Sequence, residues 1–427
     1  MWQESNILYR LKPKSEFTKN VLTLMTGTTI AQAIPVAISP ILTRLYSPKD
    51  FGVLALFVAI TSILGSIANG RYELAIMLPR KDEDAINIMA LGFIINVILS
   101  LFLFFIVIIF HDEILKLLNS KEISPWIYLV PISVFLMGCF NLLNYFNNRK
   151  KYYKDLARAN VYKSIGMAVI QLSFGFIKAG AGGLISGQIF SQIISNTKLF
   201  LNIKRLGLLE KIKKVKIIAL GKRYKDFPKF SMWAILANTL AVQLTNILIS
   251  SFYNVKTLGF YSLAQRILGM PSSLIGGAIS QVFFEEATKE KQRTGKAIKT
   301  FNSTVKKLII IGLPSFGILF FIVEDMFAFI FGEEWRIAGK YAHIVIPLFF
   351  IRFVVSPITV MNQVNLKNKL GMYWQFGLLF LYIFILYSGY LYNFEFEFIL
   401  KMISIIVSFY YIFFFFLIFN HTRGLDE

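Results

Sequence analysis

Arg352 lies near the middle of an apolar stretch that is long enough to cross a membrane. Ionised side chains are costly in hydrocarbon, so they face a cavity or a partner rather than lipid. Ser356 and Thr359 follow Arg352 at helical spacing, which places all three on one face of a helix. A guanidinium donates paired hydrogen bonds to phosphate oxygens. This face therefore predicts a site for an anionic, phosphate-bearing ligand.

Other polar side chains occur in apolar stretches where lipid would be expected. Arg266 lies in the outer part of the eighth stretch, and Arg71 and Glu73 enter the inner third of the membrane if the second stretch continues through them. Gln32 and Asn246 lie on polar faces of the first and seventh stretches. We predict a cationic cavity lined by the following residues: Arg352, Arg266, Arg71, Glu73, Gln32, Asn246, Ser356 and Thr359.

Each of these residues also has a purely structural interpretation. Arg352 could bridge two helices, and Arg266 could reach the outer headgroups. Arg71 and Glu73 could pair with each other at the inner interface. Isolated Ser, Thr and Asn side chains in membrane helices often join one helix to another.

These residues depend on long apolar helices to position them. A bilayer core about 30 Å thick needs roughly 20 apolar residues per helix. Twelve stretches qualify, near residues 21–42, 53–78, 86–110, 127–146, 162–179, 181–203, 228–252, 257–284, 308–325, 343–361, 372–391 and 396–419. We therefore predict an all-α polytopic membrane protein with 12 transmembrane helices.

Basic residues alternate between the gaps that separate these stretches. Of the 45 Lys and Arg residues, 33 fall in one alternate set of gaps and 8 in the other. Cytoplasmic loops of membrane proteins are rich in Lys and Arg, so the first set of gaps is predicted to be cytoplasmic. We therefore predict a protein of the bacterial inner membrane with both termini in the cytoplasm. The same rule accounts for the net charge of +21, so we expect contacts with membrane lipids and no nucleic acid.

The chain repeats itself weakly at an offset of 207 residues. LTRLYSPKDFGVLAL at 42–56 aligns with ISSFYNVKTLGFYSL at 249–263, including Tyr, Lys and Gly at equivalent positions. This pattern predicts a duplication with a pseudo-two-fold axis along the membrane normal and a central cavity. The predicted parts are a six-helix bundle at 1–207, a basic interfacial linker at 208–227 and a second six-helix bundle at 228–427.

Signatures of enzyme chemistry are missing from the sequence. There is no phosphate-binding P-loop motif, and the three His residues and the single Cys139 are too dispersed for a metal site. No nucleophile and base can be paired. We therefore predict no catalytic residue, no metal and no cofactor, and expect a transporter rather than an enzyme.

Two segments near the N-terminus carry a family resemblance. FTKNVLTLMTGTTIAQAIPVAISPILTRLYSPKDFGVLALF at 17–57 and GRYELAIMLPRKDEDAINI at 70–88 resemble the polysaccharide biosynthesis, or Wzx-type O-antigen, flippases. These belong to the multidrug/oligosaccharidyl-lipid/polysaccharide exporter superfamily. A later segment, FGEEWRIAGKYAHIVIP at 331–347, is similar to a recurrent part of that family. The related peptidoglycan-precursor flippases usually have fourteen membrane spans, so the twelve apolar stretches predicted here argue against that branch of the superfamily.

The resemblance implies two helical bundles around a cavity and alternating access. It implies a cargo of undecaprenyl-pyrophosphate-linked oligosaccharide, which is moved from the cytoplasmic to the outer leaflet for lipopolysaccharide O antigen, capsule or exopolysaccharide. A polysaccharide polymerase and chain-length machinery would be partners. Candidate gating or hinge residues are Pro35, Pro40, Pro271 and Arg44, although the prolines could equally be fixed kinks.

Two other function classes remain open. A small-molecule or drug antiporter of the same superfamily would need acidic residues within the membrane, and these are scarce here. A membrane-embedded glycan polymerase or ligase would have a large outer loop with catalytic polar residues. The longest predicted outer gap, 111–126, is short for that role.

Overall fold

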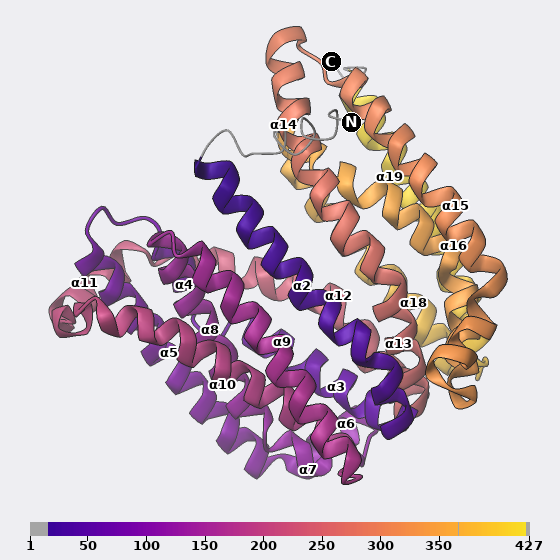
Figure 1. Cartoon of the computed structure of the whole chain (residues 1–427), viewed down its shortest axis with the longest axis horizontal. Helices are drawn as coiled ribbons and strands as arrows, with labels where there is room; N and C mark the ends of the chain where they lie inside the picture. Colours follow the sequence, from indigo (N-terminus) through magenta and orange to yellow (C-terminus); the bar gives the residue numbers. More distant parts are fainter. Residues whose placement is uncertain (1–15, 366, 424–427) are drawn as a thin grey trace, which may run out of the picture. The chain divides into compact units, whose positions relative to one another are not determined.

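The computed structural model describes residues 16–365 and 367–423, and this part of the chain is helical with no strand (Figure 1). Ten of its helices are long and apolar enough to cross a membrane. The protein is therefore a multi-pass membrane protein. The extreme ends, whose cytoplasmic location was predicted, lie outside the described residues.

The long helices correspond to the apolar stretches of the sequence. They are α2 (Glu16–Leu45), α3 (Pro48–Gly65), α5 (Asp82–Ile109), α8 (Val130–Arg149), α9 (Tyr153–Phe176), α10 (Ala181–Arg205), α12 (Met232–Phe252), α13 (Val255–Pro271), α14 (Gly277–Thr294), α15 (Ile298–Phe331), α16 (Arg336–Ile358), α18 (Asn368–Leu391) and α19 (Phe396–Arg423). Short helices are α4 (Tyr72–Ala75), α6 (His111–Leu118), α7 (Ser124–Ile127), α11 (Lys214–Arg223) and α17 (Met361–Val364).

The ten candidate spans do not include α9 and α10, which occupy the fifth and sixth predicted stretches. These helices have 24 and 25 residues, enough to cross a bilayer, but their polar side chains lower their hydropathy. The number of twelve spans therefore stays a prediction.

The chain divides into two compact units. The first takes in residues up to Ile38, then Leu64–Ile109 and Tyr128–Leu236. The second takes in Ser39–Ile63, Phe110–Ile127 and the chain from Ala237 onward. The end of α2 and most of α3 therefore pack in the same unit as the second half of the sequence.

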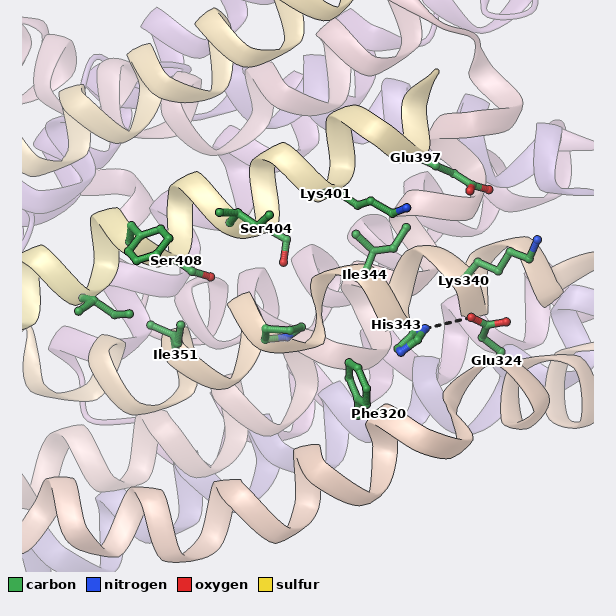
Figure 2. A pocket seen from close by; sticks show the side chains of 14 residues that line it. Phe320, Glu324, Lys340, His343, Ile344, Ile351, Glu397, Lys401, Ser404 and Ser408 are labelled. Atoms are coloured by element: carbon green, nitrogen blue, oxygen red, sulfur yellow. Dashed lines mark hydrogen bonds and ion pairs between the residues drawn. The ribbon is translucent and has the colours of Figure 1, made fainter. Parts of the chain in front are cut away.

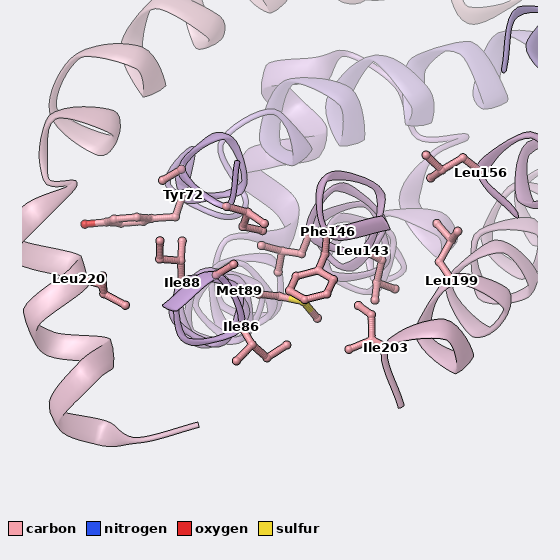
Figure 3. Packing of buried hydrophobic residues seen from close by; sticks show 14 of the residues in the cluster. Tyr72, Ile86, Ile88, Met89, Leu143, Phe146, Leu156, Leu199, Ile203 and Leu220 are labelled. Atoms are coloured by element: carbon pink, nitrogen blue, oxygen red, sulfur yellow. The ribbon is translucent and has the colours of Figure 1, made fainter. Parts of the chain in front are cut away.

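The first unit has a core of aliphatic side chains around Phe146, which is fully buried (Figure 3). Ile86 and Met89 of α5 and Leu199 and Ile203 of α10 belong to the same cluster. Helix α8 contacts both α5 and α10, so Phe146 lies where the three helices meet. Lipid tails are as apolar as these side chains, so close packing around Phe146, rather than its removal from water, stabilises this contact.

Amide side chains join the helices of this unit. Asn96 of α5 donates a hydrogen bond to the Phe135 carbonyl oxygen (2.8 Å), and Asn196 of α10 donates to that of Leu136 (2.9 Å). Both acceptors belong to α8. The structural interpretation of isolated asparagines in membrane helices holds for these two.

The basic segment around α11 is fastened to the first unit. The Asn87 amide donates to the Lys211 carbonyl oxygen (3.0 Å) and accepts from the Lys213 backbone N–H (2.8 Å). The Tyr72 hydroxyl donates to the Gly221 carbonyl oxygen (3.0 Å). This segment therefore has fixed contacts on both sides of the start of α11.

The repeated sequence segments begin two helices of the second unit in the same way. Before α3, Ser47 and Asp50 exchange hydrogen bonds: the Ser47 N–H donates to the Asp50 carboxylate (2.9 Å) and the Asp50 N–H donates to the Ser47 hydroxyl (3.3 Å). Before α13, the Asn254 side chain accepts from the Thr257 N–H (2.7 Å). Ser47 and Asn254 are equivalent in the repeat, and both cap helix N-termini whose N–H groups lack helical partners.

The first turns of α3 and α13 also pack directly on each other. A Cβ atom on Gly52 would lie 1.8 Å from the Val255 carbonyl oxygen, and a Cβ on Gly259 would lie 1.8 Å from that of Pro48. Gly52 and Gly259 are repeat equivalents, as are Pro48 and Val255. The contact is reciprocal, so a local two-fold relation between repeated segments exists within this unit.

Ion pairs and an indole surround this contact. Lys49 pairs with Glu122 (3.2 Å), and its repeat equivalent Lys256 pairs with Glu334 (3.6 Å). The side chain of Trp335 is almost fully buried, and its indole N–H donates to the Thr43 carbonyl oxygen (3.0 Å). The aromatic segment before α16 is thereby held against the end of α2.

Two helices end earlier than the apolar stretches that contain them. Arg71 and Glu73 would enter the membrane only if the second stretch continued through them as a helix, but α3 ends at Gly65 and turns follow. Gly70 (φ 58°) and Arg71 (φ 63°) are both left-handed, a conformation that ends a helix. Ser356 follows Arg352 by one turn within α16, as expected, whereas α16 ends at Ile358 and Thr359 lies in the turn that follows.

Candidate functional site: two arginine cavities in the second unit

The first cavity contains Arg352. It has a volume of about 250 Å³ and is lined by residues of α12, α13, α16, α18 and α19. The Arg352 guanidinium lies over the rings of Phe349 (5.2 Å to the centroid) and Tyr411 (6.0 Å). Tyr261 and Tyr382 also line this cavity and are buried. The cation therefore lies among aromatic rings and phenol hydroxyls.

The second cavity contains Arg266 and has a volume of about 300 Å³. Its walls come from α3, α12 and α13, and the Arg266 side chain is exposed. Gln243, Asn246 and Gln265 line both cavities. These three amides therefore lie between the two arginines.

Hydrogen bonds orient the shared amides. The Gln265 amide donates to the Tyr261 hydroxyl (2.7 Å), and the Asn246 amide donates to the Gln243 side-chain oxygen (3.2 Å). Gln265 and Tyr261 are one turn apart on α13, so this bond fixes both side chains. The amides retain further donors and acceptors that suit hydroxyl groups of a ligand.

Among the residues that the structure describes, no acidic side chain lines either cavity. Within the part of the chain that the structure describes, no carboxylate oxygen lies within 4.0 Å of the Arg266 or Arg352 guanidinium. The positive charge is therefore not neutralised by an ion pair. Such an arrangement attracts an anion and disfavours an organic cation.

Arg71 and Glu73 form an ion pair in the first unit, with 3.0 Å between Arg71 Nη1 and Glu73 Oε1. The Glu73 side chain is 2% exposed, and burial raises the pKa of its carboxyl above the ordinary value, while its hydrogen bonds and Arg71 act in the opposite direction. Glu73 Oε2 and Arg71 Nε are buried and have no hydrogen-bond partner among the described residues. Arg71 and Glu73 therefore pair with each other, as in the structural interpretation of these residues. Arg71 Nε and Glu73 Oε2 are left without a partner in this pair.

The remaining predicted residues lie elsewhere. Gln32 is exposed on the part of α2 that belongs to the first unit. Ser356 is exposed at the end of α16, and neither it nor Thr359 lines either arginine cavity. Among the predicted ligand-binding residues, the structure thus brings together Asn246 with Arg266 and Asn246 with Arg352.

The predicted hinge residues lie at different kinds of position. Pro35 and Pro40 lie within the continuous helix α2, and Arg44 is exposed in its last turn. Pro271 is the last residue of α13, and a π-helical turn, Ser272–Gly276, separates it from α14. Their role in motion stays a prediction.

The sequence reasoning missed several wall residues of the Arg352 cavity. Gln375 and Tyr382 of α18 are seven residues apart and lie on one face, and Tyr411 faces them from α19. That spacing was a usable signal. It was missed because tyrosine is common in apolar stretches and does not interrupt them.

Comparison with known proteins agrees with this architecture. The model of the family described as polysaccharide biosynthesis protein matches residues 41–339. The succinoglycan biosynthesis transport protein ExoT of Rhizobium meliloti is 22% identical over 306 residues, which cover 70% of this chain and 59% of ExoT. The teichuronic acid biosynthesis protein TuaB of Bacillus subtilis is 20% identical over 310 residues, covering 71% of this chain and 62% of TuaB. The matched part of the chain thus spans about three fifths of the length of these relatives.

Solved structures show the same fold at low identity. The lipid II flippase MurJ in an inward closed conformation has a TM-score of 0.70 and 13% identity, with coverage of 92% of this chain and 86% of MurJ. An inward-facing multidrug resistance MATE family transporter of the MOP superfamily has a TM-score of 0.66 and 12% identity, with coverage of 95% of both chains. Since the family model covers well over half of its residues, this chain belongs to the polysaccharide biosynthesis protein family.

Proposed function

We propose that this protein is a flippase that moves an oligosaccharide linked to undecaprenyl pyrophosphate from the cytoplasmic to the outer leaflet of a bacterial inner membrane. The observation that carries the proposal is the pair of arginine cavities without carboxylates. A diphosphate cannot cross hydrocarbon without groups that replace its water. Arg352 and Arg266 would supply those groups, and the amides between them would meet sugar hydroxyls.

The proposed architecture is two six-helix bundles related by a pseudo-two-fold axis, with α9 and α10 as the two spans beyond the ten candidates. The local symmetry of Gly52 and Gly259 supports the duplication. The termini would lie in the cytoplasm, and the first turns of α3 and α13 on the outer side. In this proposal their contact closes the outer side, and its opening is part of alternating access. A polymerase and chain-length machinery would take up the delivered unit.

The proposal is tested by changing Arg352 in a strain that depends on this gene for surface polysaccharide. A hydrogen bond to a charged group contributes about 1.5–3 kcal/mol, so Arg352→Ala is expected to reduce polysaccharide export by about 10-fold to 150-fold. Arg352→Lys keeps the positive charge but loses the planar guanidinium, so its polysaccharide export should lie between that of wild type and that of Arg352→Ala. The amount of surface polysaccharide is measured against the amount of protein in the membrane.

Arg336→Ala is the matched control. Arg336 is an arginine at the start of the same helix, but it pairs with Asp325 and Glu333 and lines neither arginine cavity. The control should export normally. Normal export by Arg352→Ala would remove that residue from the mechanism. Efflux of organic cations by the purified protein, with no movement of a pyrophosphate-linked saccharide in vesicles, would favour a drug antiporter instead.

A further inference from the structure

A third cavity of the second unit lies between α15, α16 and α19 and has a volume of about 760 Å³. Its charged residues gather at one end, as Figure 2 shows for Glu324, Lys340, His343, Glu397 and Lys401. Ser404 and Ser408 follow along α19 toward the other end, which is apolar. The cavity is thus a slot with a polar mouth and a hydrocarbon-lined interior.

The slot is open along its side. Phe409 is 68% exposed and Ile405 is 57% exposed, and both are apolar residues that line it. In a membrane helix such a surface faces the bilayer rather than water. A molecule could therefore enter the slot sideways from the membrane.

The length of the slot corresponds to one leaflet. Glu397 and Ile412 mark its ends on α19, and fifteen residues at 1.5 Å each separate them by about 22 Å. Half of a hydrocarbon core is about 15 Å thick. Beyond Lys401, the eleven residues to Ile412 cover about 16 Å. This part of the slot is therefore long enough for one acyl chain that extends from the headgroup level to the bilayer centre.

The mouth holds two lysines, Lys340 and Lys401, together with the carboxylates of Glu324 and Glu397. His343 is bonded to Glu324 (3.1 Å between Nδ1 and Oε1), so that carboxylate is engaged. In the described part of the chain, neither Lys340 nor Lys401 has a carboxylate oxygen within 4.0 Å of its ammonium group. Both lysines are exposed. Two free ammonium groups at the end of an apolar slot complement a phosphate at the end of a hydrocarbon chain.

One polar atom within the slot has no hydrogen-bond partner among the residues that the structure describes. Ser408 Oγ is buried and unbonded among the described residues, and its side chain is 8% exposed. A buried hydroxyl without a partner is destabilising by about 1–3 kcal/mol. An occupant of the slot with a polar atom at this depth would accept its hydrogen bond.

We infer that this slot binds an anionic phospholipid, with the phosphate between Lys340 and Lys401 and one acyl chain along α19. With the orientation predicted from loop charges, the lipid belongs to the outer leaflet. This site is separate from the two arginine cavities, since it shares no lining residue with them. The inference therefore does not depend on the transported cargo.

The experiment is native mass spectrometry of the full-length protein in detergent, with phosphatidylglycerol, phosphatidylcholine or undecaprenyl phosphate added separately. We expect phosphatidylglycerol to be retained best. Each lysine near an anionic headgroup contributes about 5-fold to binding, so Lys340→Gln with Lys401→Gln should weaken phosphatidylglycerol binding ~25-fold. The control is Lys306→Gln with Lys307→Gln, which removes the same charge from two exposed lysines of α15 outside the slot.

A second pair of variants tests the apolar part. Ile405→Trp places a larger ring in the slot and should lower retention of both phospholipids, while Phe413→Trp changes an equally exposed residue of α19 that does not line it. Three results would overturn the inference. These are equal retention of phosphatidylglycerol and phosphatidylcholine, an equal loss of phosphatidylglycerol binding in the Lys306 and Lys307 control, and unchanged phospholipid binding by Ile405→Trp. Retention of undecaprenyl phosphate in place of phosphatidylglycerol would also overturn it, since the occupant would then be the carrier lipid.

Discussion

Replacing Gly259 with alanine should loosen the contact between the first turns of α3 and α13. The new Cβ would lie 1.8 Å from the Pro48 carbonyl oxygen, whereas real Cβ atoms essentially never come closer than 3.0 Å to a neighbour. The obstacle is backbone, which cannot rotate away as a side chain can. The two helices must therefore separate by at least about 1.2 Å at this point.

The expected cost follows from this displacement. Overpacking of a well-filled core is destabilising by about 1–3 kcal/mol. Alanine favours the helix by up to ~1 kcal/mol relative to glycine, which offsets part of the loss. We expect a net loss of about 1–2 kcal/mol, with weaker burial of Trp335, which packs at 5.8 Å from the ring of Phe260 beside this contact.

The assay is thermal unfolding of the purified protein in detergent, with Gly317→Ala as the matched control. Gly317 lies in α15, and a Cβ there would meet no atom within 4 Å. Gly259→Ala should melt at a lower temperature than wild type, and Gly317→Ala should not. Gly52→Ala should resemble Gly259→Ala because its Cβ would meet the Val255 oxygen at the same distance.

A double variant decides whether the contact is shared. Once Gly259→Ala has separated the helices, Gly52→Ala should cost little more, so the two losses should not add. Full additivity would refute the reciprocal contact. Wild-type melting of Gly259→Ala would refute the close approach itself.

Three further changes test contacts elsewhere in the chain. Trp335→Phe removes the indole donor to the Thr43 oxygen and should lower stability by about 1–3 kcal/mol, measured by thermal unfolding, with no loss if that bond is absent. Tyr72→Phe removes the bond to the Gly221 oxygen and should increase protease cleavage near α11 without unfolding the first unit, while unchanged cleavage would contradict the fastening. Burial raises the pKa of the Glu73 carboxyl, so this group stabilises the fold at low pH and the stabilisation is lost as the pH rises through the raised value. Glu73→Gln cannot ionise, so its melting temperature should rise relative to that of wild type as the pH increases, and a parallel pH dependence of the two proteins would contradict this.

Much of the fold could be predicted because hydropathy alone identifies membrane helices. Helices α5, α15 and α19 fall where long apolar stretches were expected. The break after α3 was also accessible, since Asn69-Gly70 is a turn signal that the apolar run around it concealed. The left-handed backbone at Gly70 and Arg71 is its direct consequence.

The candidate site could be predicted only in part. Arg352 could be singled out from the sequence, because a charged side chain in the middle of a membrane helix is costly unless it faces a cavity or a partner. Periodicity shows which face of a helix a residue occupies but not which other helix it meets. The shared amides and the tyrosines around Arg352 therefore required coordinates, as did the finding that Gly52 and Gly259 contact each other.

The fastening of α11 has a practical consequence for cutting the chain in two. A break at Gly207 would leave the bonds to Asn87 and Tyr72 to be re-formed between separate polypeptides. A break between Lys225 and Asp226 would keep them within one fragment. Co-expressed halves divided at the later position should reassemble more readily, which also makes it the better place for new termini in a circular permutation.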